Sequence, residues 1–497
     1  MRSDIYTLLP MATTVIGAFV MLLLSSSKSI TLIRYHLITV AILLLSLALS
    51  LPLFGSGKSI YPLDNIFHQA FIVDDFSILF DIMFLGGAVL TLLVNTLYLK
   101  KRDYYNGEFY ALFLFTIFGM MILAHSNDLI VAFIGLEVAS LSIYALVGYH
   151  KNNPLSSEAM LKYMVLGAFV GSMFLLGSVM IYILVGSTNI ADITSFIQNE
   201  GESNQLALTV AGTLLLITIL FKVGAVPFHT WVLDVYEGSP FPITMFMASV
   251  FKISIFAIAL RIYVAYFATG VLHGDVILSI VTIVTLIGGS LLAISQTKLK
   301  RVLAGSSIVH GGYMLIALSC IGLGSQLAVP AVMFYLLSYF ISSVGAFGIL
   351  SYLSADSKRA LRYEDFKGFA DKRPYLSAMM AIFMLSLSGF PSTIGFLGKF
   401  YIFTVAIESK QFILAALGIA VAFISIYYYF KLIAFMYFYS SPNTKKEKFK
   451  LSLSTSLIAL MAILAILGGI GTSLIPMIPS ADSLLGIASV ASSSLGY

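Results

Sequence analysis

The sequence predicts an all-α polytopic membrane protein, on the basis of its composition, the length of its apolar segments and the placement of its basic residues. Of the 497 residues, 59% are hydrophobic and only 10% are charged, whereas about 25% of a typical soluble domain is charged. The mean hydropathy is +0.98. So few polar residues cannot cover the surface of a soluble fold with a single core, and such folds are excluded.

About 14 segments are apolar over the ~20 residues that a helix needs to cross the hydrocarbon core of a bilayer. We expect the first to be a retained helix rather than a cleaved signal sequence, because its apolar run is long and Asp4 offsets the charge of Arg2. The segments lie near residues 6–25, 33–53, 76–99, 109–124, 128–149, 158–186, 206–237, 241–268, 274–295, 302–322, 326–354, 375–406, 411–438 and 452–478.

Two segments, helices seven and twelve in this order, are too long for one crossing. We expect the seventh to break between Gly224 and Pro227 and the twelfth between Gly389 and Pro391, because proline interrupts a helix. The two breaks are five helices apart, and a unit with an odd number of helices inserts upside down in its second copy. Inverted repeats with broken helices are typical of transporters.

The predicted repeats divide the chain into four parts. Residues 1–105 hold helices 1–3, and residues 106–270 form the first inverted repeat with helices 4–8. Residues 271–440 form the second inverted repeat with helices 9–13, and residues 441–497 hold the C-terminal helix 14.

The basic residues of the loops predict the orientation, because Lys and Arg gather on the cytoplasmic side. One side carries only Arg2, Lys58 and Lys410. The other side carries most of the remaining basic residues, in clusters near 100–102, 298–301, 358–373 and 445–450. This alternation favours an even number of helices. It predicts a multi-pass protein with both termini on the outer, periplasmic side. We expect the bacterial inner (plasma) membrane, and the residues alone leave a plastid or mitochondrial membrane as the alternative.

The sequence also excludes several classes of site. The single cysteine, Cys320, rules out an intrachain disulfide and zinc or iron–sulfur sites built from cysteines alone. The seven histidines are scattered without metal-ligand spacing. There is no phosphate-binding loop, dinucleotide fingerprint or nucleic-acid-binding module. We therefore expect no metal and no cofactor on this chain, and no nucleic-acid partner.

Four charged residues lie inside apolar segments, where each costs roughly 2.5–3.5 kcal/mol to insert. They are Glu137, Lys222, Lys252 and Lys399. Such residues usually mark ion or proton paths. The alternatives are a neutral buried carboxyl for Glu137 and, for each lysine, an amine that extends to the membrane interface.

Proton transfer suits these residue types. A free lysine holds its proton too tightly at neutral pH, but desolvation loosens it and a nearby carboxylate restores the charge. Glu137 beside Lys222 therefore predicts a switch, with Lys252 and Lys399 as the next stations. His310 lies between them in sequence and suits a relay. The alternative is a structural histidine.

Other charged residues are expected nearer the membrane surface. Glu158 and Lys162 have the i,i+4 spacing of a helix-face ion pair, which is either a site of proton uptake or coupling on the basic side or a plain interfacial pair. We expect His229, with Asp234 and Glu237, to form a polar cytoplasmic mouth. Two further residues are expected at the interface, Arg261 by extending its side chain and Trp231 as an anchor.

Several motifs together resemble a known family. They are the runs 157–163, 221–231, 236–240, 300–304, 306–310, 389–391 and 395–400. Together they resemble the antiporter-like membrane subunits of respiratory complex I, most closely the subunit N family. The resemblance covers roughly helices three to thirteen. Lysine at position 399 is typical of subunits N and L rather than M, and the chain lacks the long C-terminal lateral helix of L.

The resemblance implies a proton-translocating subunit of an NADH–quinone oxidoreductase with fourteen helices and two inverted repeats. It implies that Glu137 and Lys222 form the charge pair of the first half-channel, that Lys252 connects the halves and that Lys399 ends the second. Glu158, Lys162 and His229 match positions with supporting roles. NADH, flavin, iron–sulfur clusters and quinone would belong to partner subunits, and this chain would contact neighbouring membrane subunits and the lipid bilayer.

Two other functions stay open. The first is a subunit of a multisubunit Na⁺/H⁺ antiporter, which the same buried charges would serve without any redox partner. The second is a scaffold that holds neighbouring subunits apart. Buried charges argue against a scaffold, because inert packing does not require about 10 kcal/mol of insertion cost.

Overall fold

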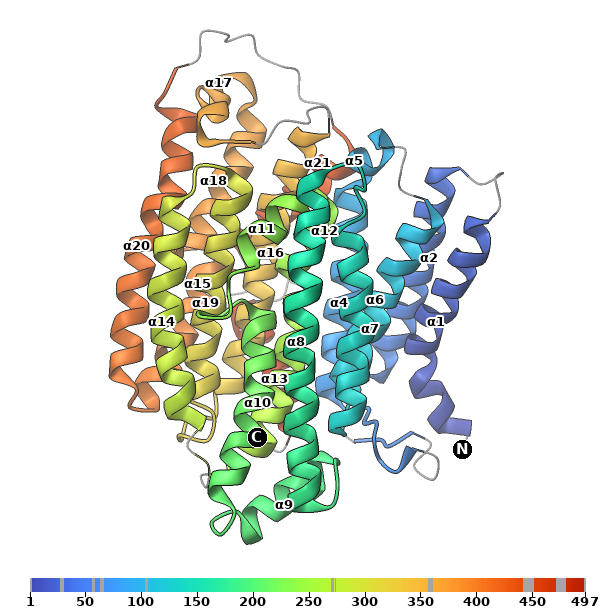
Figure 1. Cartoon of the computed structure of the whole chain (residues 1–497). Coiled ribbons are helices and arrows are strands. Elements are labelled where there is room, and N and C mark those ends of the chain that lie inside the picture. The colour runs from blue at the N-terminus through green and yellow to red at the C-terminus, as the bar shows by residue number, and fades with distance from the viewer. Residues whose placement is uncertain are drawn as a thin grey trace.

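Long apolar helices run side by side through the molecule (Figure 1). The computed structural model describes residues 2–26, 31–55, 59–62, 67–102, 106–269, 272, 274–355, 361–440, 451–470 and 480–495. Across these residues the secondary structure is helical, with β-bridges only as isolated pairs. The all-α membrane fold that the sequence predicts is confirmed.

Twelve helical spans in the described residues are long and apolar enough to cross a membrane. Ten lie within single helices, whereas Ile33–Leu53 joins α2 (Leu32–Ser50) to η1 and Phe241–Tyr266 joins α12, η2 and α13. The single helices are α1 (Arg2–Ser25), α4 (Asp75–Val94), α6 (Gly107–His125), α7 (Leu129–Val147), α8 (Pro154–Val185), α10 (Gln205–Val223), α14 (Gly274–Ser295), α15 (Leu299–Ser319), α16 (Ala328–Ser354) and α20 (Phe412–Tyr437).

The remaining predicted spans correspond to shorter helices. The predicted span 375–406 contains α18 (Pro374–Ser388) and α19 (Ile394–Glu408), and 452–478 contains α21 (Leu453–Leu467), with residues 471–478 outside the described chain. The count of about 14 crossings, the four-part division and the inverted repeats stay predictions. The other short elements are η1 (Leu51–Leu53), α5 (Thr96–Lys101), α9 (Ile190–Glu200), α11 (Val232–Gly238), η3 (Tyr363–Phe366), α17 (Phe369–Lys372) and α22 (Ala481–Ser493).

Both predicted breaks occur, and they share one geometry. Helix α10 stops at Gly224 and α18 stops at Gly389, each with a φ of +83°. In each case the glycine N–H donates to carbonyls three and four residues back, and the next residue's N–H donates five residues back, at 2.8 Å and 2.9 Å. Left-handed φ at a helix C-terminus favours glycine. The matching caps agree with the predicted internal repeat.

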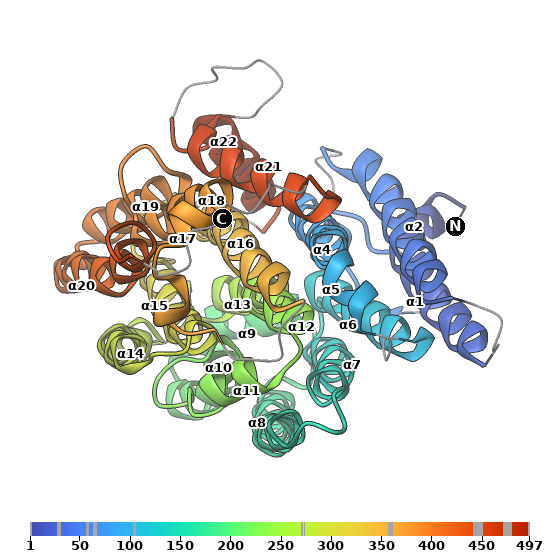
Figure 2. The same ribbon diagram turned by 90° about the horizontal axis from the view of Figure 1, so that it is seen from above.

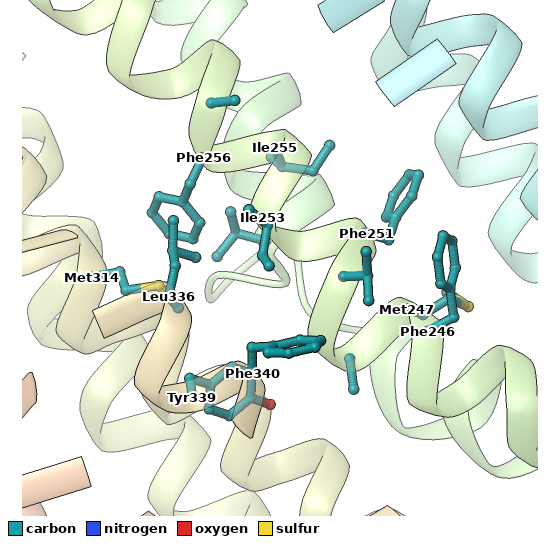
Figure 3. Packing of buried hydrophobic residues seen from close by; sticks show 14 of the residues in the cluster. Phe246, Met247, Phe251, Ile253, Ile255, Phe256, Met314, Leu336, Tyr339 and Phe340 are labelled. Atoms are coloured by element: carbon teal, nitrogen blue, oxygen red, sulfur yellow. The ribbon is translucent and has the colours of Figure 1, made fainter. Parts of the chain in front are cut away.

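The core of the bundle lies around α13 (Lys252–Tyr266), which follows α12 (Phe241–Phe246) and a π-helical turn, η2 (Met247–Phe251). Viewed from above, α13 and α16 are surrounded by the other helices (Figure 2). The most apolar stretches of Phe241–Tyr266 and of α15 are wholly buried. Figure 3 shows buried side chains of this span, among them Ile253 and Phe256, together with Leu336 and Tyr339 of α16. Helices buried on all sides lie away from lipid, which is where buried charges can be partnered.

The two ends of the bundle differ in charge. Helix α5 ends in Lys100 and Lys101, and helix α17 ends in Lys372. Both helices lie at the upper end in Figure 1, whereas α9 lies at the lower end. Lys58 and the basic residues at 358–359 and 445–450 lie outside the described residues. Which end faces the cytoplasm stays a prediction.

Substituting Gly224 tests the break in the seventh predicted helix. A Cβ at Gly224 would lie 2.7 Å from Val232 Cγ2, on a backbone that L-residues rarely adopt. We expect Gly224→Ala to destabilise the protein by about 1–2 kcal/mol, measured by thermal unfolding in detergent. Gly86→Ala is the control, because this position in α4 is open space with ordinary helical backbone. Equal effects of the two substitutions would contradict the argument.

Candidate functional site

Lys222 lies in the last turn of α10, just before the break at Gly224. Its side chain is inside the protein and the residue is only 3% exposed. The ammonium donates to Ser140 Oγ at 2.8 Å and to Tyr144 Oη at 2.9 Å, both on α7. It also lies 5.0 Å from the Tyr144 ring centre and 5.3 Å from that of Tyr163. Lys222 therefore does not extend to the membrane surface, and neutral groups hold it.

Glu137 lies on α7, one turn before Ser140. Its Oε1 is buried without a hydrogen-bond partner among the described residues. A Cβ on Gly171 of α8 would lie 2.7 Å from that oxygen, so the glycine leaves room for the carboxyl. Within the described chain no ion pair joins Glu137 to Lys222, because Ser140 and Tyr144 take the ammonium. The two residues are neighbours on this face, and their predicted switch stays a prediction.

Lys252 follows the π-helical turn Met247–Phe251 directly. A π-turn inserts an extra residue into a helix and is often found at functional sites. The Lys252 ammonium donates to the backbone oxygen and the Oγ of Ser307 on α15, both at 2.6 Å. The Tyr339 ring of α16 lies 5.7 Å away. Lys252 is 3% exposed, so it too is held inside the bundle by neutral oxygen atoms.

His310 lies on α15, one turn after Ser307, and is buried. Its Nδ1 is 2.8 Å from Tyr335 Oη of α16, and its Nε2 is 3.0 Å from Tyr429 Oη of α20. Tyr429 also bonds to the Ser306 hydroxyl. Both ring nitrogens therefore contact hydroxyl groups, which can donate or accept a proton. This arrangement suits a relay better than a single structural hydrogen bond would.

Lys399 lies in α19, the second half of the broken span, and is 4% exposed. Its ammonium donates to the backbone oxygen of Ser388 at 2.8 Å and lies 4.9 Å from the Tyr313 ring centre. Ser388 is the last residue of α18, where the helix break leaves its carbonyl without an intrahelical partner. The break thus supplies the acceptor that the buried lysine needs.

An aromatic cluster lies between Lys222 and Lys252. Trp231 stacks on Tyr163 with ring centres 4.3 Å apart, and its Nε1 donates to the Phe221 carbonyl at 3.0 Å. Trp231 is 3% exposed, so the expected interface anchor is wrong. Next along the cluster, Tyr236 Oη lies 3.5 Å from Ser307 Oγ, the group that holds Lys252. The surroundings of Lys222 and Lys252 are therefore joined by packed aromatic rings, and a proton relay between them stays a prediction.

A network of charged side chains joins α8 to α11 near one end of these helices. Lys162 contacts Glu158 Oε1 at 2.7 Å, as the i,i+4 spacing predicts, and also Asp234 Oδ2 of α11 at 2.7 Å. Asp234 is partly buried, which raises its pKa, but hydrogen bonds from Lys162 and Arg301 outweigh burial and hold the pKa below its ordinary value.

The network continues to the start of α15. Arg301 bridges Asp234 at 2.9 Å and Glu237 at 2.7 Å, and Glu237 also pairs with Lys298. Burial raises the pKa of Glu237, but the two basic partners bring it below its ordinary value. His229, half-buried, has no hydrogen-bond partner on Nδ1 among the described residues, and burial lowers its pKa. His229 is near the break but is not part of this network.

Comparison with known proteins places these residues in a family. The model of the NADH:quinone oxidoreductase/Mrp antiporter transmembrane family matches residues 126–425. An NADH-quinone oxidoreductase subunit N of Trichlorobacter lovleyi is 37% identical over 372 residues, 75% of this chain and 76% of that protein. One from Myxococcus xanthus is 34% identical over 475 residues, 89% of this chain and 90% of that protein. The chain belongs to the subunit N family of NADH-quinone oxidoreductases. The resemblance seen in the motifs is confirmed.

Solved structures agree with the subunit N fold. A chain of respiratory complex I from Thermus thermophilus, solved with bound aureothin, matches with a TM-score of 0.75 and 29% identity, over 93% of this chain and 98% of that one. A chain of the Mrp complex from a Dietzia species matches with a TM-score of 0.81 over 98% of this chain and 97% of that one, at 19% identity. The second likeness concerns the fold alone.

Sequence reasoning about this subunit N chain missed a second buried charged cluster. Arg261 is not at the interface as expected. It is 5% exposed, and its guanidinium donates to both carboxylate oxygens of Asp74 at 3.0 Å and 3.1 Å. Nearby, His125 Nε2 lies 2.8 Å from Asp81 Oδ2. Asp81 lies well inside the apolar run of α4, and that placement could have identified it. Among the described residues no group of three or more metal-binding side chains occurs.

The network at α8 and α11 predicts a pH dependence of stability. Because the folded-state pKa values of Asp234 and Glu237 lie below their ordinary values, the network stabilises the fold above the ordinary carboxyl range near pH 4. That contribution is lost as the pH falls through the lowered values. We expect the double variant Asp234→Asn/Glu237→Gln to lower the unfolding temperature at neutral pH and to flatten its fall in acid. Parallel pH profiles of variant and wild type would contradict this.

Proposed function

We propose that this chain is a proton-translocating membrane subunit of an NADH-quinone oxidoreductase complex. One observation carries the proposal. Lys222, Lys252 and Lys399 are each buried, and in the described residues each ammonium is hydrogen-bonded only to hydroxyl and carbonyl oxygens. A lysine held by neutral acceptors can lose its proton without leaving a buried carboxylate unpaired, which a permanent ion pair cannot do.

The proposed path follows the buried residues in the order of their contacts. Glu137 and Lys222 form the first station, at the break between α10 and α11. Lys252, held by Ser307, forms the second. His310, between two tyrosine hydroxyls, passes the proton toward Lys399. Glu158, Lys162 and His229 support proton uptake or coupling at the basic end. A proton would move because the charge at one station raises or lowers the proton affinity of the next station.

Redox chemistry belongs to other chains in this proposal. NADH, flavin, iron–sulfur clusters and quinone would bind to partner subunits, and quinone reduction there would drive this chain through conformational or electrostatic coupling. The partners are neighbouring membrane subunits and the lipid bilayer. The proposed location is the bacterial inner membrane, with the basic end at the cytoplasm and both termini outside.

A second candidate is a subunit of a multisubunit Na⁺/H⁺ antiporter. The matching family is shared by quinone oxidoreductases and Mrp antiporters, and the fold resembles that of the Dietzia Mrp chain. A tagged chain extracted gently and separated under native conditions distinguishes the two. We expect a large complex with NADH-driven quinone reduction. Small assemblies with sodium-dependent exchange and no electron donor would favour the antiporter.

Removing Lys222 tests the proposed path at its first station. We expect Lys222→Ala to abolish proton pumping while the complex still assembles, because Ser140 and Tyr144 lose the group that carries the proton. Pumping is measured in proteoliposomes alongside quinone reduction. Lys100→Ala is the control, since Lys100 is an exposed residue of α5. Normal pumping by Lys222→Ala would overturn the switch.

His310 tests the connection between Lys252 and Lys399. A side chain that accepts and donates protons contributes about 10²–10⁴-fold to the rate of a proton transfer. We expect His310→Ala to slow coupled turnover by about 10²-fold, whereas His68→Ala, at an exposed position, leaves the rate unchanged. An equal rate for His310→Ala and wild type would show that His310 is structural.

A further inference from the structure

The buried pair of Asp81 and His125 lies outside the path described above. Asp81 is on α4 and His125 is the last residue of α6, and both are about 3% exposed. His125 Nε2 is 2.8 Å from Asp81 Oδ2, and His125 Nδ1 is 3.0 Å from the backbone oxygen of Ile72. The second oxygen of Asp81, Oδ1, is buried with no hydrogen-bond partner among the described residues.

The contact with Ile72 fixes the number of protons on this pair. A backbone carbonyl can only accept, so His125 Nδ1 must carry a hydrogen. A 2.8 Å contact between Nε2 and a carboxyl oxygen then requires one more proton between them. That proton sits on the carboxyl of a neutral pair or on the imidazolium of an ion pair. In both cases the pair holds one transferable proton, and its net charge is zero.

Loss of that proton would leave a carboxylate facing the lone pair of Nε2, which repel each other. The net charge of the pair would become −1 in a buried site, and this charge would favour arrival of the next proton. The pair therefore releases one proton and takes up one proton in each cycle, and no other reactant is needed. The unpaired Asp81 Oδ1 provides an oxygen through which a proton can arrive or leave.

A neighbouring ion pair fixes the backbone around Asp81 and His125. Arg261 donates to Asp74, which caps α4, and to the carbonyl of Ala124, the residue before His125. Arg261 and Lys252 are nine residues apart on the same helix, α13, or roughly 13 Å at 1.5 Å per residue. Arg261 and Asp74 are positioning residues, because their contacts hold the segments that carry the dyad.

The pair lies near the end of the bundle that is opposite to the basic network. Asp128, just after His125, bridges Asn189, just before α9, and α9 lies at the lower end in Figure 1. The segment 69–73 bonds to His125 and to the chain just after it. Its backbone bonds to His125 and Asn127, through Ile72 N to the His125 oxygen and Asn127 N to the Ala70 oxygen. Gln69, at the start of this segment, is exposed, whereas Ile72 is buried and bonds to His125.

We propose that Asp81 and His125 form a proton-holding dyad that serves proton release at the end of the bundle away from the basic network. This rests on the proposed function, because a release station requires a proton supply from the lysine path. The dyad takes up one proton and releases it toward the segment 69–73.

Isosteric variants of the intact complex test the dyad. Asp81→Asn can donate an amide hydrogen bond to His125 Nε2 but has no carboxyl to hold the transferable proton. His125→Gln keeps a polar partner for Asp81 but removes the imidazole that shares and exchanges that proton. We expect both complexes to assemble and to reduce quinone in detergent, and to lose this subunit's share of the protons pumped per NADH in proteoliposomes. Asp75→Asn is the matched control. It replaces a buried carboxyl on the same helix that accepts from Gly55 instead, and we expect it to pump like wild type.

Three outcomes would contradict the dyad. An unchanged proton yield in both variants would overturn it, and so would failure of both to assemble, since the contact would then be structural. An equal loss in Asp75→Asn would show that any buried carboxyl at this end has the effect. Lys222→Ala is measured in the same preparation. If Lys222→Ala pumps normally, the proposed lysine path is wrong. If Lys222→Ala loses pumping while Asp81→Asn pumps normally, only the dyad is overturned.

Discussion

An ammonium group inside a membrane protein needs oxygen partners within the protein, and the architecture around the three buried lysines meets this need. In a regular helix most carbonyls accept hydrogen bonds from the helix itself, so few are free to accept from another group. Near each lysine the helix is irregular, with caps at Gly224 and Gly389 and a π-turn before Lys252. Irregular backbone is tolerated at this depth only where protein satisfies it. At Lys399 the break itself supplies the acceptor, which is the carbonyl of Ser388. Lys222 and Lys252 lie beside irregular backbone but take their acceptors from the neighbouring helices α7 and α15.

The chain partners its charges in two distinct ways. At the basic end, acidic and basic side chains alternate from Glu158 to Lys298, and each ion is held by an opposite charge. Along the proposed path, the lysines contact hydroxyls, carbonyls and aromatic rings instead. Paired ions resist a change of protonation, whereas ions with neutral partners permit it. The Asp81–His125 dyad is a third case, in which one shared proton replaces a fixed charge.

Local signals in the sequence predicted the fold class, the two helix breaks and the buried Lys222, Lys252, Lys399 and His310, because a charge or a Gly–Pro step in an apolar run is visible without any partner. Long-range pairing was not predictable. Asp74 and Arg261 are 187 residues apart, so Arg261 was wrongly expected at the interface, as was Trp231. The π-turn lies in an apolar run without glycine or proline, so no sequence signal indicated it.

The central claim is that one continuous path carries the protons, and the double variant Ser307→Ala/His310→Ala tests it most directly. Ser307→Ala removes a hydroxyl that holds Lys252, and His310→Ala removes the imidazole one turn further along α15. The measurement is the pumping rate of the double variant in proteoliposomes beside those of the two single variants. A serial path predicts that the double variant pumps about as slowly as the slower single one. Multiplication of the two losses would indicate independent effects and contradict a single path.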